Sequence, residues 1–121
     1  MIPSLASHYP LALASSSRRA DVDSILQALG LAEHYRTIVS GENVSTGKPN
    51  PEIYLLAAQR VGVKPAACVV IEDSHNGVVA AKRTGMRCIA VTQTHPREAL
   101  VHADVVVDRL DRLSPTLMEA L

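Results

Sequence analysis

The sequence has no phenylalanine and no tryptophan, and its three tyrosines are its only aromatic residues. A hydrophobic core must therefore be built mainly from Val, Leu, Ile and Ala. With 47% of apolar and 20% of charged residues, the composition is typical of a globular protein and excludes a disordered or fibrous one. No run approaches the roughly 18 apolar residues of a membrane helix, and residues 1–10 lack the basic and apolar regions of a signal peptide. We expect a cytoplasmic protein with no membrane partner.

Neither charge nor cysteine is in excess. Twelve Lys and Arg balance twelve Asp and Glu, so the chain lacks the surplus of positive charge that neutralises nucleic-acid phosphates, and we expect no nucleic-acid partner. Cys68 and Cys88 each begin an apolar run outside any C-x-x-C pair or Cys/His cluster. We expect buried, reduced thiols rather than a disulfide or a zinc site. The length of 121 residues predicts a single domain over residues 1–121.

Apolar runs alternate with helical patterns along the chain, which is typical of a parallel sheet covered by helices. The strand-like runs are residues 9–15, 35–41, 68–72, 87–92 and 104–108. The helical patterns are residues 16–30, 51–62, 74–85, 96–103 and 114–121. Because the runs are short, continuous and β-branched, we expect strands that are buried on both faces.

Two helices have clear end signals. The first pattern places Val22, Ile25, Leu26 and Leu29 on one apolar face and ends at Gly30. Ser74 is a typical N-cap for the helix that follows residues 68–72. The sequence therefore predicts which residues face the core and where these helices begin or end.

Three polar segments lie where strands lead into helices: "ASSSR" at 14–18, "STGKPNP" at 45–51 and "EDSHNG" at 72–77. In parallel sheets, ligands bind beyond the carboxyl ends of the strands. Taken singly, the serines could cap a helix, Lys48 could be a solvated charge, and the two acids could interact with a helix dipole. Taken together, the three segments predict a phosphate site with a metal ion.

Each part of that site has a chemical role. The hydroxyls after Ser15 and the unpaired N–H groups of a first helical turn can bind an anion, and Lys48 adds a positive charge. Adjacent carboxylates repel each other unless a cation lies beside them, and Glu72 and Asp73 are adjacent. Asp73 suits Mg²⁺, and Glu72 can orient Lys48 or a metal-bound water.

The segments "LALASSS", "GKPNPEIYLLAAQRVGV" and "VVIEDSHNGVVAAKRTGM" occur in this order and resemble three motifs of the haloacid dehalogenase-like (HAD) hydrolases. The branch that they resemble contains the β-phosphoglucomutase-like phosphatases and mutases. The resemblance implies a three-layer, Rossmann-like α/β core. It also implies Mg²⁺-dependent phosphoryl transfer or hydrolysis on a small phosphorylated metabolite of the sugar-phosphate type.

The resemblance also implies roles for individual residues. Ser15 would be the phosphate-binding hydroxyl, and Lys48 would steady the nucleophile and the phosphoryl group, so both are candidate catalytic residues. Asp73 would bind Mg²⁺ with Glu72 in support, which makes these two the candidate metal site. Three further residues fall where relatives contact phosphate or substrate, namely Ser16, Ser17 and Arg18.

The nucleophile motif of that family, D-x-D-x-[TV] after an N-terminal strand, has no counterpart before "LALASSS". Asp21 and Asp23 form the one D-x-D here, but they lie in a helical pattern, and we interpret them as a solvated helix face. The inserted cap domain of the family has no counterpart either. The chain therefore resembles the C-terminal portion of a HAD enzyme, with residues 1–10 as the remnant of a helix and its exit turn, and we expect it to be inactive alone.

An alternative is a non-catalytic remnant that binds phosphate or Mg²⁺ and acts through self-association. In the family the nucleophile strand lies between the strands that end at Ser15 and Glu72. Without it, these two strands would either pair directly or be covered by a second subunit, and a homodimer is the expected partner state. A receiver-like signalling domain also needs an Asp after a strand, and "GKPNPEIY" does not suit it. His75 is expected at a solvent-facing position.

Overall fold

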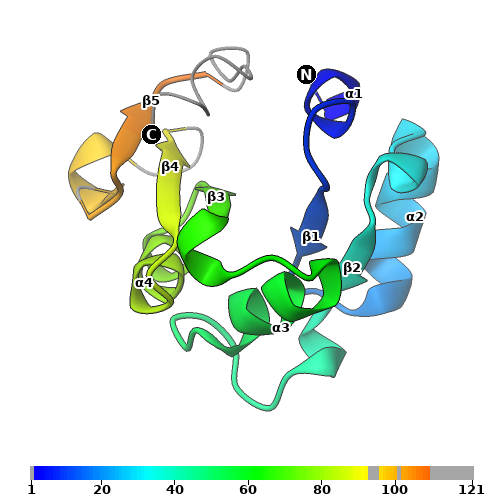
Figure 1. The fold of residues 1–121 in the computed structure, drawn as a ribbon, viewed down its shortest axis with the longest axis horizontal. Coiled ribbons are helices and arrows are strands. Elements are labelled where there is room, and N and C mark those ends of the chain that lie inside the picture. Colours follow the sequence, from blue (N-terminus) through cyan, green and yellow to red (C-terminus); the bar gives the residue numbers. More distant parts are fainter. Residues whose placement is uncertain (1, 93–95, 101, 110–121) are drawn as a thin grey trace.

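The computed structural model describes residues 2–92, 96–100 and 102–109. Helices and parallel strands alternate in it, as the sequence predicted (Figure 1). The helices are α1 (Ile2–Ala6), α2 (Arg19–Leu29), α3 (Glu52–Val61) and α4 (His75–Arg83). The strands are β1 (Ala12–Ala14), β2 (Thr37–Val39), β3 (Val69–Glu72), β4 (Arg87–Val91) and β5 (Val105–Val107). Short 3₁₀ turns cover Ala32–His34, Gly41–Asn43, Pro65–Ala67 and Arg97–Leu100.

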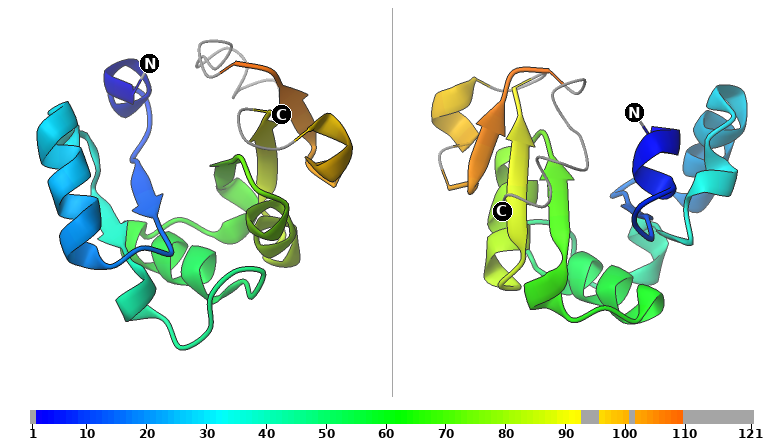
Figure 2. Two further views of the ribbon diagram at one scale, coloured as in Figure 1. Left: turned by 180° about the vertical axis from the view of Figure 1, so that it is seen from behind. Right: turned by 45° about the horizontal axis from the view of Figure 1, so that its top comes forward.

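The strands form two separate parallel sheets. One sheet is β1–β2, in which Ala12 lies opposite Thr37, and the other is β3–β4–β5. The two sheets stand on either side of an opening, with β1 and β3 nearest to it (Figures 1 and 2). Within the described residues β1 and β3 do not pair, so direct closure of these two strands, one of the two expected outcomes, is wrong. The halves are instead joined on the helix side by α3, which packs on β1 and β2 and contacts α4.

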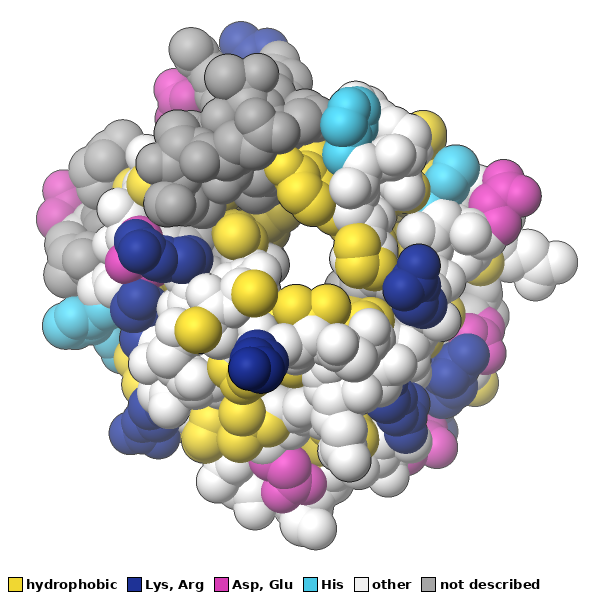
Figure 3. Space-filling model, viewed as in Figure 1, with side chains coloured by type: hydrophobic (Ala, Val, Ile, Leu, Met, Phe, Trp, Pro, Cys, Tyr) yellow, Lys and Arg dark blue, Asp and Glu magenta, His cyan; other side chains and the backbone are white. Residues whose placement is uncertain are grey.

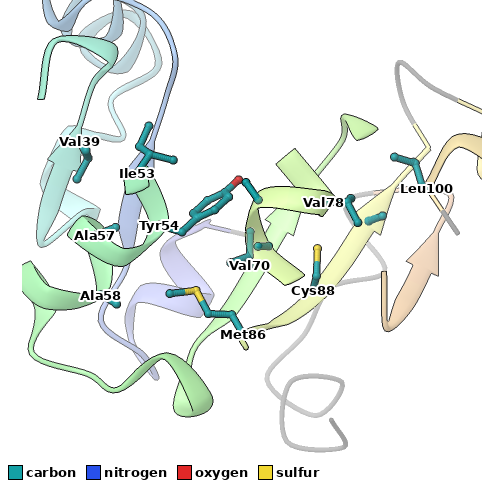
Figure 4. Packing of buried hydrophobic residues seen from close by; sticks show 13 residues of the cluster. Val39, Ile53, Tyr54, Ala57, Ala58, Val70, Val78, Met86, Cys88 and Leu100 are labelled. Atoms are coloured by element: carbon teal, nitrogen blue, oxygen red, sulfur yellow. The ribbon is translucent and has the colours of Figure 1, made fainter. Parts of the chain in front are cut away.

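One hydrophobic cluster bridges the two halves (Figure 4). Val39 and Ile53 contribute from the β1–β2 half, and Val70 and Val78 from the other half, each at most 8% exposed. The cluster contains one aromatic residue, Tyr54, whose ring lies between the halves (Figure 4). Small aliphatic side chains therefore fill this core, as the composition requires.

Two burial predictions are wrong in part. On α2, Val22 and Leu26 are buried, but Ile25 and Leu29, on the same apolar face, are 59% and 62% exposed, because neighbouring elements cover only part of that face. The strand β3 was expected to be buried on both faces. Its Val70 is buried, whereas Val69 and Ile71, which point to the opposite face, are at least 36% exposed.

Predicted helix ends agree better with the structure. Gly30 ends α2 in a left-handed conformation, and the Ser74 hydroxyl accepts a hydrogen bond from the backbone N–H of Gly77. The segment 96–103, expected to form a short helix, contains a 3₁₀ turn at Arg97–Leu100. The helix predicted at residues 114–121 lies outside the described residues. In the described ranges, no helix combines the length and apolarity that a membrane crossing requires.

The two cysteines differ in their environment. Cys88 on β4 is fully buried, whereas Cys68 is half-buried before β3. Burial, with a smaller effect of nearby carboxylates, raises the pKa of Cys88 to about 12. Its thiol is therefore a neutral part of the core at physiological pH.

The loop before β5 is held by Asp104. Its Oδ2 accepts hydrogen bonds from the backbone N–H of Cys88 at 2.7 Å and from Lys82 Nζ at 2.8 Å. Lys82 Nζ also donates to the carbonyl of Met86 at 3.2 Å. One carboxylate thus ties α4, β4 and the β4–β5 connection together.

We expect Asp104→Ala to lower the free energy of unfolding by about 1–3 kcal/mol, because it leaves the buried N–H of Cys88 without an acceptor. Glu33→Ala is a matched control, since Glu33 is 80% exposed and contacts only His34 at 3.9 Å among the described ion pairs. Urea denaturation of both variants checks the prediction. Equal free energies of unfolding for the two variants would show that the hydrogen bonds of Asp104 do not stabilise the fold.

Candidate functional site

A buried ion pair lies where α3, β3 and α4 meet. Lys48 Nζ donates to Glu72 Oε2 at 2.9 Å, and the two side chains are only 13% and 9% exposed. The Tyr54 hydroxyl donates to the same oxygen. The Lys48 ammonium also stands over the Tyr54 ring, 5.0 Å from its centroid. Two side chains, one from the loop before α3 and one from α3, thus converge on one carboxylate oxygen at the end of β3.

The second oxygen of Glu72 is held by the start of α4. Oε1 accepts hydrogen bonds from the backbone N–H groups of Asp73 and Ser74 and from the Ser74 hydroxyl, at 3.0–3.3 Å. Burial by itself raises the pKa of Glu72, but the charge of Lys48 and the hydrogen bonds that Glu72 accepts outweigh it and lower the pKa to about 2. Glu72 is therefore a carboxylate at physiological pH.

Tyr54 keeps its proton in this environment. Burial, followed by the negative charge of Glu72, raises the pKa of Tyr54 far above its usual value. Its hydroxyl is therefore a hydrogen-bond donor to Glu72 at every physiological pH. In Figure 4 that hydroxyl is directed away from α3 toward the β3 half.

Two glycines permit the close approaches that build the site. A Cβ atom on Gly77 would overlap the Glu72 carboxyl group, so Glu72 can lie against α4 only because this position lacks a side chain. A Cβ atom on Gly41 would overlap the carbonyl oxygen of Ser16, and the Gly41 N–H donates to the carbonyl of Ser17 at 3.0 Å. Gly41 thus allows the loop after β1 to lie against the loop after β2.

A polar cavity of about 420 Å³ opens beside the ion pair. Its lining comes from the loop after β1, from Lys48 and from the N-cap and first two residues of α4, in the residues Ser16, Lys48, Ser74, His75 and Asn76. The carboxyl ends of β1 and β3 therefore meet at one cavity, although the two strands belong to different sheets. Hydroxyl, amide and ammonium groups around a cavity of this size suit a small anion such as phosphate.

The serine segment is only partly at the cavity. Ser16 lines it, whereas the Ser15 hydroxyl accepts a hydrogen bond from the N–H of Ser17 at 3.1 Å. Arg18 is exposed and pairs with Asp21 at 3.5 Å. Asp23 pairs with Arg19 at 2.8 Å and is 53% exposed, which agrees with the interpretation of Asp21 and Asp23 as a solvated helix face. Roles of Ser15, Ser17 and Arg18 in phosphate binding stay predictions.

The two residues predicted to form the metal site, Glu72 and Asp73, have different environments. Both oxygens of Glu72 accept hydrogen bonds within the protein, which suits an orienting role toward Lys48. Asp73 follows directly at the end of β3 and is half-buried. In the part of the chain that the structure describes, no group of three or more His, Cys, Asp or Glu side chains could hold a metal ion. A single carboxylate with waters and a substrate phosphate is nevertheless a normal environment for Mg²⁺.

Four further residues belong to the site. Tyr54 carries the hydrogen bond and the ring contact described above, and Ser74, expected only as a helix cap, also lines the cavity with His75 and Asn76. His75 is exposed, as expected, but it is exposed at the cavity. The signal for Tyr54 was available, because a tyrosine on an apolar helix face needs a partner for its hydroxyl. No signal in the sequence indicated that Asn76 lines the cavity.

Comparisons with known proteins agree with this geometry. Residues 1–91 match the family model of the haloacid dehalogenase-like hydrolases. The chain is 39% identical over 101 residues to a validoxylamine A 7'-phosphate phosphatase of Streptomyces hygroscopicus subsp. limoneus, covering 84% of this chain and 47% of the relative. It is 38% identical over 108 residues to a β-phosphoglucomutase of Bacillus subtilis, covering 89% of this chain and 46% of that enzyme.

A solved structure is similar along nearly the whole chain. CbbY from Rhodobacter sphaeroides, in complex with phosphate, superimposes with a TM-score of 0.85 and 30% identity, covering 99% of this chain and 56% of CbbY. The chain thus spans less than half the length of the two curated relatives and little more than half of the solved one. The family match, the shared fold and the motifs at the cavity lead to one conclusion: the chain belongs to the haloacid dehalogenase-like hydrolases.

Proposed function

We propose that the cavity binds the phosphoryl group of a small phosphorylated metabolite of the sugar-phosphate type, as the binding part of a HAD-type phosphatase or mutase. The observation that carries the proposal is the Lys48 side chain, which lines the cavity together with Ser16 while its ammonium group is paired with Glu72. Lys48 and the Ser16 hydroxyl would donate to phosphoryl oxygens, whereas the Ser74 hydroxyl already donates to Glu72. Relatives named as phosphatases of phosphorylated small molecules support the substrate class.

The proposal includes Mg²⁺ as the cofactor. Asp73 would hold the ion next to the bound phosphate, and when bound the ion would neutralise negative charge on the phosphoryl oxygens. Glu72 would act on Lys48 rather than on the metal. The proposal also includes a cytoplasmic location, for which the two free thiols of Cys68 and Cys88 are the support.

A second candidate is binding without catalysis. It is favoured by the cavity lining, in which the described residues include no carboxylate that could attack phosphorus as an aspartyl nucleophile does. Asp21 and Asp23 are on the exposed side of α2. Residues 1–121 would then bind phosphate and Mg²⁺ but hydrolyse nothing alone.

We expect inorganic phosphate to bind the chain and Lys48→Ala to weaken this binding roughly 10- to 100-fold, because a charge-assisted hydrogen bond is lost. Isothermal titration calorimetry measures the phosphate affinity of each variant. Lys64→Ala is the matched control, since Lys64 is exposed and does not line the cavity. Lys48→Gln tests the same point if the alanine variant unfolds, because the amide still donates to Glu72. Equal affinity in all variants would contradict the proposed site.

Turnover separates the two candidates. Hydrolysis of p-nitrophenyl phosphate that needs Mg²⁺ and is lost in Lys48→Ala supports an active phosphatase. Phosphate binding with no hydrolysis supports the non-catalytic candidate.

We expect Asp73→Asn to abolish the gain in phosphate affinity that Mg²⁺ produces, as measured by titration with and without the ion, whereas Asp108→Asn should keep it. A gain that survives in Asp73→Asn would remove Asp73 from the metal site.

We also propose a homodimer that covers the open centre of the two sheets. The support is that, among the described strands, β1 and β3 each have one unpaired edge, beside an opening whose rim carries many hydrophobic side chains (Figure 3). We expect sedimentation velocity to give a dimer at micromolar concentration. Ile71→Lys on β3 should shift it toward monomer, whereas Leu29→Lys on the exposed side of α2 should not. A monomeric wild-type chain would exclude this partner.

A further inference from the structure

Tyr54 contacts both members of the buried ion pair but does not line the cavity. Its hydroxyl donates to Glu72 Oε2, the oxygen that Lys48 Nζ also contacts, and its ring face lies 5.0 Å from Lys48 Nζ. The side chain is 6% exposed, so both contacts are sheltered from water. We propose that Tyr54 is a positioning residue that keeps the Lys48 ammonium directed into the cavity.

The hydroxyl acts on the strength of the ion pair. An O–H group that donates to Oε2 occupies part of the acceptor capacity of that oxygen, so that less of it is left for the N–H groups of Lys48. Without this donor, Lys48 would be the principal partner of Oε2 and would turn more of its N–H groups toward the carboxylate. Fewer of its N–H groups would then be left for an anion in the cavity.

The ring acts on the direction of Lys48. An ammonium group is attracted to the face of a tyrosine ring, and the attraction is stronger where water is excluded. The ring and Oε2 thus constrain Nζ from two directions. Because Glu72 Oε1 accepts hydrogen bonds from the backbone N–H groups of Asp73 and Ser74, the carboxylate is held in place when the Lys48 ammonium group moves.

The alternative is that Tyr54 is only a core residue and that the hydrogen bond of its buried hydroxyl has a purely structural role. Tyr54 is indeed a member of the hydrophobic cluster (Figure 4). The two interpretations differ in what the hydroxyl controls. A core tyrosine affects stability alone, whereas a positioning tyrosine also affects the anion affinity of molecules that are fully folded.

The inference rests on the proposed function, since the anion in question is phosphate. Tyr54→Phe keeps the ring and removes the hydroxyl, and we expect it to weaken phosphate binding about three- to tenfold at constant pH. Tyr35→Phe, which alters a half-buried tyrosine away from the cavity, is the matched control and should bind like the wild type. Circular dichroism establishes that both variants are folded under the conditions of the titration. A folded Tyr54→Phe with wild-type phosphate affinity overturns the inference.

A second measurement keeps the inference apart from the proposed function. In the wild-type chain without phosphate, the ε-methylene protons of Lys48 should be shifted upfield by the Tyr54 ring, relative to those of the exposed Lys64, in a ¹H–¹³C NMR spectrum. If phosphate does not bind but this shift is present, the proposed function fails while the contact between Tyr54 and Lys48 stands. If the shift is absent, Tyr54 does not position Lys48, whether or not phosphate binds.

Discussion

The buried pair of Lys48 and Glu72 is the constraint on which the site depends. Two charges that are 13% and 9% exposed have lost most of their hydration, and their mutual attraction compensates for this loss only if further hydrogen bonds complete the arrangement. Here the N–H groups of Asp73 and Ser74 and the hydroxyls of Ser74 and Tyr54 supply them. The loop before α3, the end of β3 and the start of α4 must therefore meet in one geometry.

This constraint explains features that otherwise look unrelated. Gly77 is needed because Glu72 lies where its Cβ atom would be. The Arg83 side chain at the end of α4 donates to the carbonyl of Pro49, next to Lys48, at 3.2 Å. The adjacent acids Glu72 and Asp73 are tolerated because the first is paired with an ammonium group and has its pKa lowered to about 2, burial notwithstanding.

Local signals in the sequence identified much of this arrangement. The periodicity of apolar residues predicted α2 and α3, Ser74 and Gly30 marked helix ends, and the motifs around Lys48 and Glu72 predicted that they belong to one site. The exposure of Ile25 and Ile71 was not predictable, because it depends on which faces other elements cover. The need of the Tyr54 hydroxyl for a partner was predictable, but the identity of that partner was not, because Glu72 lies 18 residues away in sequence.

The same contacts also hold the divided molecule together. Lys48 and Tyr54 belong to the half that contains β1 and β2, whereas Glu72 and Arg83 belong to the half that contains β3 and β4. No strand of the described chain crosses between the sheets, so these polar contacts and the hydrophobic cluster form the connection between them. An anion bound between the Ser16 loop and the Ser74 turn would contact both halves. Since such a ligand binds only when the halves are docked, binding and docking would stabilise each other.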